Sequence, residues 1–324
     1  MNWNIRTALL MAVLLAGCNS AVDDDYQQYI LSEDEQKDYL DYARPPQQFG
    51  FKVSSNQGGN IALQGVARLH PLHAASVNFI GGDAPVIRLG GKARRMKMHA
   101  LLDTSSPTSW MEFDKAEEFD AIPLGIDGQV FPYQGDYDTG AVNAFAAVVT
   151  QMRIDQLFIE NVPLYVRMAA YTLGPLNRGI YNPVIDGVLG YDVLGTFEYI
   201  QIDLERGMIS FSATSPYTPN ENLLMTAARI LSAPNYGLAV EGAIFDEPSP
   251  IILDIAGNYY FENSNAESSV TEQVSLGEVV YLKVPTRLPT QRNLPPRAGR
   301  LMLRKYIITI CPKKGVVYFE RPLR

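Results

Sequence analysis

The sequence predicts an all-β fold of two lobes that repeat each other along the chain. Short apolar or alternating segments recur between clusters of Gly, Pro and Asn, which is typical of strands joined by tight turns. Two of the apolar segments end in an Asp followed by small residues, at Asp103 and at Asp254. Each is followed by a second matched segment in the same order, and self-similarity of fixed order indicates a duplication.

Residues 1–17 are predicted to be a bacterial targeting segment and take no part in the fold. An arginine precedes the apolar stretch 8–16, which is too short to span a membrane stably. The sequence Leu-Ala-Gly-Cys18 matches a lipobox, so we expect cleavage before Cys18 and lipid attached to it. Because Asn19 is not the Asp that commonly retains lipoproteins at the inner membrane, we expect the outer membrane, facing the periplasm or the cell surface.

Residues 18–48 are predicted to form an acidic tether that holds the body of the protein off the membrane. Asp and Glu gather in it, and a Pro-Pro-Gln-Gln sequence ends it. The rest of the chain is long enough for two lobes with their own cores. We assign the N-terminal lobe to 49–222 and a shorter, more divergent C-terminal lobe to 223–324.

The first lobe begins with a predicted hairpin. Segments 85–91 and 96–102 form its two strands, and the second strand ends at Asp103. Thr104 and Ser105 come next. Taken alone, this sequence also fits a capped turn, because the side chains of Asp, Thr and Ser hydrogen-bond their own backbone.

The middle of the first lobe carries a predicted short helix at 114–119 and a turn-rich, aromatic stretch at 130–140. A longer strand follows that stretch. Segment 155–165 is predicted to be two short strands joined by a turn at Glu160 and Asn161.

The second matched segment comes later in each lobe. In the first lobe, 187–194 leads into two strands that meet at a charged turn closed by Gly207. In the second lobe, 299–303 leads into the C-terminal strands, whose turn is closed by Gly315. The two turns differ by about one residue, which loop tolerance allows. Segment 224–231, between the lobes, could be either a strand or a short helix.

The second aspartate has surroundings like those of the first. Segment 237–245 is predicted to be a strand that enters a turn, and the apolar run 251–253 then ends at Asp254. Ile255 and Ala256 follow this Asp. Both aspartates are therefore expected at the end of the second strand of a hairpin.

Together these motifs resemble the two-lobed, pepsin-like aspartic proteases, or a fused pair of retropepsin-like lobes, over about residues 60–322. Asp103-Thr104 corresponds to the catalytic pair of that family. Gly187 and Gly190, in the sequence Asp-Gly-Val-Leu-Gly, correspond to the segment that supports the active-site loop. The resemblance implies an acid-protease-like double β-barrel with an internal pseudo-two-fold repeat and one catalytic Asp from each lobe.

The resemblance also implies roles for other residues of the first lobe. Thr104 would orient Asp103, while Ser105 stands where the family has Gly. A flap hairpin is expected to cover the cleft, and Tyr133 and Tyr137 are the candidates for its aromatic residue. An ordinary surface hairpin is the alternative for this stretch.

The second motif departs from the family. Ile255 and Ala256 stand where the family has Thr or Ser and then Gly, so half of the hydrogen-bond network between the two loops is expected to be missing. Both aspartates are nevertheless present. Two carboxylates that share one proton supply a base and an acid for the attack of water on a peptide bond, because like charges in contact cannot both ionise.

Other chemistry is largely excluded. The net charge of −8 argues against a nucleic-acid partner. The three His residues lack metal-ligand spacing and the Gly pairs lack the order of a phosphate loop, so we expect neither a metal nor a cofactor. With Cys18 lipidated, Cys311 has no disulfide partner and is predicted to be a small buried residue of an apolar strand.

The leading hypothesis is a membrane-anchored aspartic endopeptidase that hydrolyses a peptide or protein substrate with Asp103, Asp254 and an activated water, best at acidic pH. The extended peptide would lie across the cleft under the flap. The alternative is a catalytically inactive peptide-binding lipoprotein of the same fold, because Ile255 and Ala256 make the second motif degenerate. A third hypothesis is an unrelated β-rich lipoprotein that binds a ligand or partner.

Overall fold

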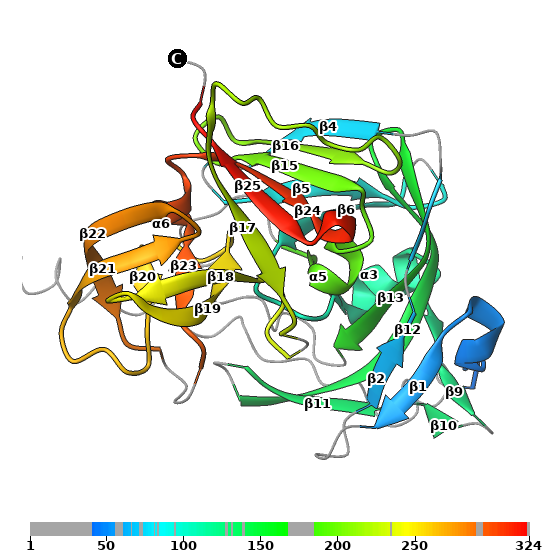
Figure 1. The fold of residues 1–324 in the computed structure, drawn as a ribbon. Helices are drawn as coiled ribbons and strands as arrows, with labels where there is room; N and C mark the ends of the chain where they lie inside the picture. The colour runs from blue at the N-terminus through cyan, green and yellow to red at the C-terminus, as the bar shows by residue number, and fades with distance from the viewer. Residues whose placement is uncertain are drawn as a thin grey trace, which may run out of the picture.

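The computed structural model describes residues 41–322, except for 56–60, 66, 71–73, 81, 83, 94, 127–128, 131, 138–139, 168–184, 234 and 290–293. Most of the described chain is strand, and the strands close into two six-stranded barrels. In Figure 1 the first lobe runs from cyan to green and the second from yellow to orange. The predicted all-β, two-lobed fold is therefore confirmed.

The first barrel starts from the predicted hairpin, which is formed by β5 and β6. The ring order is β5 (Val86–Gly90), β6 (Lys97–Leu102), β14 (Gly187–Leu189), β7 (Trp110–Glu112), β13 (Leu157–Arg167) and β12 (Gly140–Ile154). The pair Arg153↔Gly90 joins β12 back to β5 and closes the ring. The β6–β14 and β7–β13 pairs are parallel, and the other four pairs are antiparallel.

The second barrel repeats this plan. Its ring order is β18 (Ala239–Ile244), β19 (Glu247–Asp254), β23 (Arg297–Gly299), β20 (Phe261–Glu262), β22 (Val279–Arg287) and β21 (Val270–Leu276), which pairs with β18 again. The β19–β23 and β20–β22 pairs are parallel, and the rest are antiparallel. Because strand order and direction agree at every step, the two lobes are copies of one topology.

A sheet with strands from both halves of the chain joins the lobes. Its order is β17 (Leu224–Leu231), β25 (Val316–Glu320), β24 (Ile307–Cys311), β15 (Tyr199–Asp203), β16 (Met208–Ser212) and β4 (Ala74–Asn78). The two matched hairpins, β15–β16 and β24–β25, meet at its centre through the antiparallel pair β15–β24. The pseudo-two-fold axis therefore passes between β15 and β24, and segment 224–231 is a strand.

Short elements complete the fold. They are η1 (Pro46–Phe49), β1 (Lys52–Ser55), β2 (Ile61–Gln64), β3 (Arg68–Leu69), α3 (Phe113–Glu118), β8 (Ile122–Pro123), β9 (Gly125–Ile126), β10 (Gln129–Val130), β11 (Pro132–Tyr137), α5 (Tyr191–Leu194), α6 (Arg300–Leu303) and η2 (Pro312–Lys314). Helix α3 confirms the helix predicted at 114–119. Helices α5 and α6 follow β14 and β23, so they too are equivalent in the two lobes.

Left-handed backbone positions also repeat. Asp155 (φ 52°) and Gly277 (φ 55°) open the two-residue turns of the β12–β13 and β21–β22 hairpins. Asn161 (φ 51°) and Lys283 (φ 52°) are each the fifth residue of the hairpin's second strand. A left-handed residue inside a strand is uncommon outside Gly, so its recurrence at one position supports a duplicated backbone.

The turn predicted at Glu160 and Asn161 is wrong. The β12–β13 ladder continues on both sides of Asn161, with Gln151 opposite Glu160, and the turn lies at Asp155. Asn tolerates the left-handed region because its short polar side chain can bond locally. An Asn that supports an irregularity inside a strand therefore has the same sequence signal as an Asn in a turn.

The main hydrophobic core is continuous through both lobes and the shared sheet. It contains residues of the first barrel such as Phe145, residues of the second such as Leu276, and Ile310 of the shared sheet, all almost fully buried. Cys311 on β24 is fully buried, as predicted for a small residue of an apolar strand. A smaller cluster in the first lobe includes Phe51, which shows that the chain packs on this lobe soon after the predicted tether.

Candidate active site

Equivalent strands carry the two aspartates. Asp103 directly follows β6, and Asp254 is the last residue of β19. Each strand has a parallel neighbour at its end: the Asp103 N–H donates to the Leu189 carbonyl at 3.0 Å, and Asp254 pairs with Gly299. The duplication therefore places the two Asp-bearing loops at corresponding points of the two barrels.

Gly187 and Gly190 lie where the sequence predicted support for the first loop. A Cβ on Gly190 would come within 2.3 Å of the Thr108 carbonyl, and one on Gly187 within 2.6 Å of the Trp110 carbonyl. No real Cβ makes such contacts, so only glycine lets β14 pass this closely behind the loop. Gly299 plays the same part in the second lobe, since its Cβ would lie 2.3 Å from the Tyr259 carbonyl.

Thr104 joins the two loops. Its hydroxyl donates to the Leu253 carbonyl and accepts the Ile255 N–H at 3.4 Å, so it contacts the residues on both sides of Asp254. Its own carbonyl accepts the Leu238 N–H at 2.7 Å. Thr104 is fully buried. These three bonds hold the first loop directly against the second lobe, between residues that are far apart in the chain.

The reciprocal bonds are missing on the other side. Ile255, the counterpart of Thr104, has no hydroxyl; its side chain is buried in the main hydrophobic core. Pro85, the counterpart of Leu238, has no N–H to give. The expected loss of half of the network is therefore seen as a one-sided junction, in which each of the three bonds described above involves Thr104.

Asp103 is half-buried and held by its own loop. Its Oδ1 accepts the Ser105 N–H at 2.8 Å, the Ser105 hydroxyl at 2.7 Å and the Ser106 N–H at 3.2 Å. Burial, together with the negative charge of Asp254, raises the pKa of Asp103 to about 6, although the Ser105 bonds and Arg297 act against this rise. A second negative charge raises the pKa of a carboxyl group because it disfavours the ionised form.

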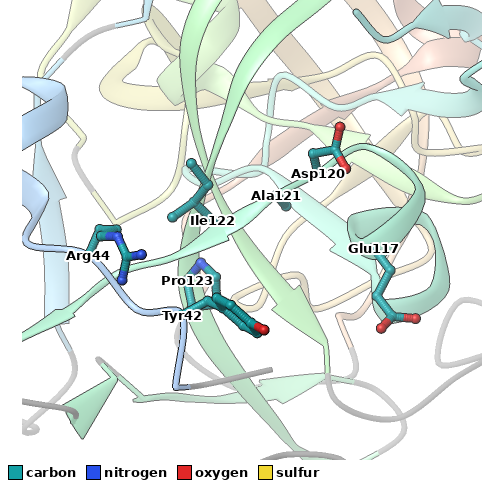
Figure 2. A pocket seen from close by; sticks show the side chains of 7 residues that line it. All are labelled: Tyr42, Arg44, Glu117, Asp120, Ala121, Ile122 and Pro123. Carbon is teal, nitrogen blue, oxygen red and sulfur yellow. The ribbon is translucent and has the colours of Figure 1, made fainter. Parts of the chain in front are cut away.

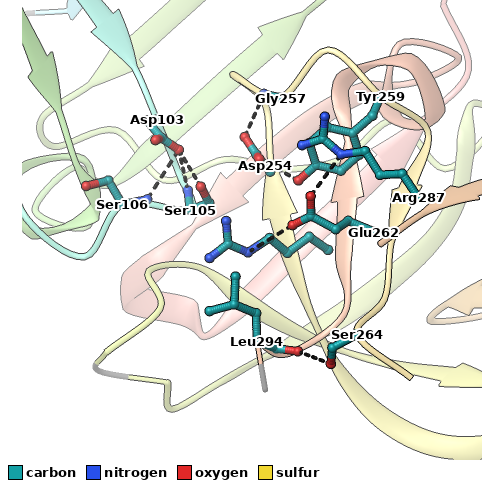
Figure 3. Close-up of polar contacts among 11 residues, drawn as sticks. Asp103, Ser105, Ser106, Asp254, Gly257, Tyr259, Glu262, Ser264, Arg287 and Leu294 are labelled. Carbon is teal, nitrogen blue, oxygen red and sulfur yellow. Dashed lines mark hydrogen bonds and ion pairs between the residues drawn. The ribbon is translucent and has the colours of Figure 1, made fainter. Parts of the chain in front are cut away.

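Asp254 is more deeply buried, with 6% of its surface exposed. Its Oδ1 accepts the Gly257 N–H at 2.7 Å, and its Oδ2 accepts the Tyr259 hydroxyl at 2.6 Å. Figure 3 shows Asp103 and Asp254 facing each other across the junction, each with these bonds drawn. The structure thus brings together the two predicted acids, with Thr104 and Ser105 beside them.

Charged side chains line the second-lobe side of the site. Glu262 is 5% exposed and accepts the Arg287 Nε–H at 2.8 Å, while Arg297 Nε lies 4.0 Å from its other carboxylate oxygen. The Arg287 guanidinium lies 3.9 Å from the centroid of the Tyr259 ring. The loop before β23 is tied by the Ser264 hydroxyl, which donates to the Leu294 carbonyl (Figure 3).

The predicted flap stretch is a hairpin of β11 and β12. Tyr133 pairs with Ala144, and Tyr137 pairs with Gly140 beside the turn. The side chains of both tyrosines lie outside the described part of the structure, so neither is placed relative to the aspartates. Cys18 also lies outside the described residues.

A surface pocket of about 410 Å³ lies elsewhere, where the N-terminal segment meets the end of α3 (Figure 2). It is lined by Tyr42, Arg44, Glu117, Asp120, Ala121, Ile122 and Pro123, and contains neither aspartate of the site. Within the described ranges, no helix is long and apolar enough to cross a bilayer. In the same ranges no three side chains of His, Cys, Asp or Glu gather in a way that suits a metal.

Sequence comparison gives no relative from which to carry over a function. No protein-family model matches the chain, and no curated protein matches it significantly.

Two groups of residues at the site have no clear signal in the sequence. Tyr259 was not predicted, because a Tyr five residues after an Asp has no recognised pattern. Ser109 and Asp192 were also missed: Asp192 accepts the Ser109 N–H at 2.9 Å and its hydroxyl at 2.6 Å, and burial raises its pKa to about 6. The signal for Asp192 was its place two residues after Gly190, in the first turn of α5.

Proposed function

We propose that this chain is an aspartic endopeptidase in which Asp103 and Asp254 act as one pair. The observation that carries the proposal is the meeting of two Asp-bearing loops from equivalent strand ends, joined by the buried hydroxyl of Thr104. The raised pKa of Asp103 supports it, because a carboxyl that keeps its proton beside an ionised one can act as an acid.

The chemistry needs one proton on the pair. The ionised carboxylate takes a proton from water while the water oxygen bonds to the peptide carbonyl carbon, and the protonated carboxyl gives its proton to the carbonyl oxygen. The resulting diol then collapses: the C–N bond breaks, the leaving nitrogen takes a proton from the first carboxyl, and a hydroxyl returns a proton to the second. The pair ends as it began, and no cofactor takes part.

The substrate in this proposal is an extended peptide, and the β11–β12 hairpin is the segment that would cover it. Anchoring through lipid on Cys18, in the outer membrane facing the periplasm or the cell surface, belongs to the same proposal. It would confine the activity to substrates that reach the membrane surface.

Casein and a quenched-fluorescent peptide library test the proposal across the acidic and neutral range. We expect hydrolysis at acidic pH that is lost as pH rises through about 6, the pKa of Asp103. Asp103→Asn and Asp254→Asn should each abolish it, while Asp114→Asn, on the exposed side of α3, serves as the matched control. Cleavage that survives both site variants would contradict the proposal.

One observation favours a second candidate, a peptide-binding protein without catalysis. The junction between the loops is one-sided, because the Ile255 side chain has no hydroxyl and Pro85 has no N–H, so neither can make the bond that its counterpart in the other lobe makes. Under this candidate the wild-type chain would bind peptides from the same library with no cleavage at any pH. Isothermal titration with uncleaved peptides separates it from the endopeptidase.

A further inference from the structure

Among the described residues of the first lobe, no tyrosine donates to Asp103 as Tyr259 donates to Asp254, and comparison of the two loops shows what the Tyr259 hydroxyl replaces. The Tyr191 N–H donates to the Ser106 carbonyl, and the equivalent Arg300 N–H donates to the Gly257 carbonyl. Ser106 therefore corresponds to Gly257, and Ser105 to Ala256. Asp103 receives a hydroxyl from Ser105, but Ala256 has no hydroxyl for Asp254.

The Tyr259 hydroxyl reaches the same kind of acceptor from further along the loop. It donates to Asp254 Oδ2 at 2.6 Å, and the Gly257 N–H donates to Oδ1 at 2.7 Å. Both oxygens of Asp254 thus receive a donor from the second loop. Donors to both oxygens stabilise the ionised form of a carboxyl group.

The loop is shaped around the ring of Tyr259. A Cβ on Gly257 would lie 2.3 Å from ring atom Cε1, and one on Gly299 would lie 2.6 Å from Cδ2. On the other side, the guanidinium of Arg287 covers the ring at 3.9 Å, and Glu262 fixes that guanidinium. Two glycines and a cation therefore hold the ring, which is 7% exposed, in one position.

We propose that Tyr259 is a positioning residue that holds Asp254 as the ionised base of the pair, so that the shared proton resides on Asp103. This inference rests on the proposed function and assigns the two roles within it. Burial and the negative charge of Asp254 raise the pKa of the Tyr259 phenol far above its usual range, so it stays a donor. The other charged groups facing the site are Glu262, Arg287 and Arg297.

Tyr259→Phe is the direct test, because it removes the hydroxyl and keeps the ring between its glycines. The first measurement needs no activity: carboxyl ¹³C NMR titration of Asp254 in the Asp103→Asn background. With Tyr259→Phe added, we expect the carboxyl resonance of Asp254 to change at higher pH than it does with the hydroxyl present. Tyr260→Phe, the neighbouring residue, is the control and should leave the titration unchanged.

The second measurement is the pH profile of peptide hydrolysis in the otherwise wild-type chain. We expect Tyr259→Phe to lower kcat about 10- to 100-fold, to move the acidic limb upward and to change KM little. Adding Ala256→Ser, which places a hydroxyl where Ser105 has one in the first loop, should recover part of both losses. A purely structural role for Tyr259 predicts no such rescue.

The two measurements separate this inference from the proposed function. If the Asp254 titration is the same with and without the Tyr259 hydroxyl, the inference is overturned, whatever the activity. If the titration shifts as expected but the wild-type chain cleaves no peptide, the role of Tyr259 in ionising Asp254 stands and the endopeptidase proposal fails.

Discussion

Thr104 is the only residue of the first loop whose side chain joins it to the second loop, among the bonds of the described chain. In a symmetrical pair of loops each side would share this task, but the Ile255 side chain has no hydroxyl and Pro85 has no N–H. The Ile255 side chain instead adds apolar burial to the main core. At this junction, apolar packing of Ile255 stands in place of one set of hydrogen bonds. The side-chain hydrogen bonds between the loops therefore depend on the Thr104 hydroxyl.

Thr104→Val tests this dependence with a side chain of nearly the same shape. The Leu253 carbonyl and the Ile255 N–H would lose a partner in a fully buried place, so we expect about 1–3 kcal/mol of lost stability and a large loss of activity. Urea denaturation measures the first. Ser76→Ala removes an exposed hydroxyl of the shared sheet and should change stability little; equal losses in both variants would contradict the argument.

The raised pKa of Asp103 also predicts how stability depends on pH. The folded protein keeps a proton up to about pH 6 that the unfolded chain releases near the ordinary value of 3.8. Between these values the folded state binds more protons than the unfolded state, so stability falls as pH rises through this window. The contribution of Asp103 is complete below about pH 4 and lost above about pH 6.

Asp103→Asn removes this titration, so the variant should gain stability relative to wild type as pH rises from about 4 to 7, by on the order of 1–3 kcal/mol. Urea midpoints at both pH values measure it. Asp114→Asn, on the exposed face of α3, should follow the wild-type dependence. A wild-type-to-variant difference that stays constant with pH would show that Asp103 titrates normally.

At the scale of elements, the site depends on two strand–helix units, β14–α5 and β23–α6, which pass behind the loops. Gly190 and Gly299 cap the two helices with nearly the same backbone angles, φ −86° and −85°. Neither position requires a left-handed backbone, so the need for glycine comes from space alone: each has a carbonyl 2.3 Å from where a Cβ would be.

Gly190→Ala and Gly299→Ala should therefore each cost about 1–3 kcal/mol, and both should lower peptide hydrolysis, because the loop must move away from the strand behind it. Gly315→Asn is the matched control: it lies in the β24–β25 turn with open space and φ 67°, a conformation that Asn accepts. We expect its thermal midpoint to stay near wild type. Tolerance of Ala at position 190 would contradict the packing argument.

The sequence was sufficient for the elements whose signal is local. The hairpins that end at Asp103 and Asp254, the helix after the first motif and the C-terminal strands all follow from alternating or apolar runs bounded by Gly and Pro. Recognition that these came in two ordered sets was enough to predict two lobes and to bring Asp103 and Asp254 together.

The remaining features could not be read from local sequence, because they depend on contacts between distant segments. Segment 224–231 is a strand because it pairs with β25. Asn161 has a left-handed backbone because it lies inside a long hairpin. The role of Tyr259 arises only where Asp254, two glycines and Arg287 meet. No rule of residue propensity or spacing predicts that these residues lie together.

At the scale of the whole molecule, the lobes share more than the site. The sheet that joins them has one of the two matched hairpins on each side of its centre, and the main core contains buried residues of both barrels. If one lobe unfolded first, the core residues of the other lobe that pack against it would be exposed to water. An intermediate with one folded lobe is therefore unfavourable. We therefore expect one cooperative unfolding transition for the chain.

A single tryptophan allows a direct test of this expectation. The chain has two Trp residues, and one lies in the predicted targeting segment, so Trp110 on β7 reports the first barrel alone in the processed protein. Leu276→Ala removes a fully buried side chain of the second barrel and should cost about 2–5 kcal/mol. If the lobes unfold together, the Trp110 fluorescence midpoint in urea will fall by the same amount as the midpoint from circular dichroism. Leu282→Ala, on the same hairpin but 71% exposed, should shift neither; a Trp110 midpoint that ignores Leu276→Ala would mean that the barrels unfold independently.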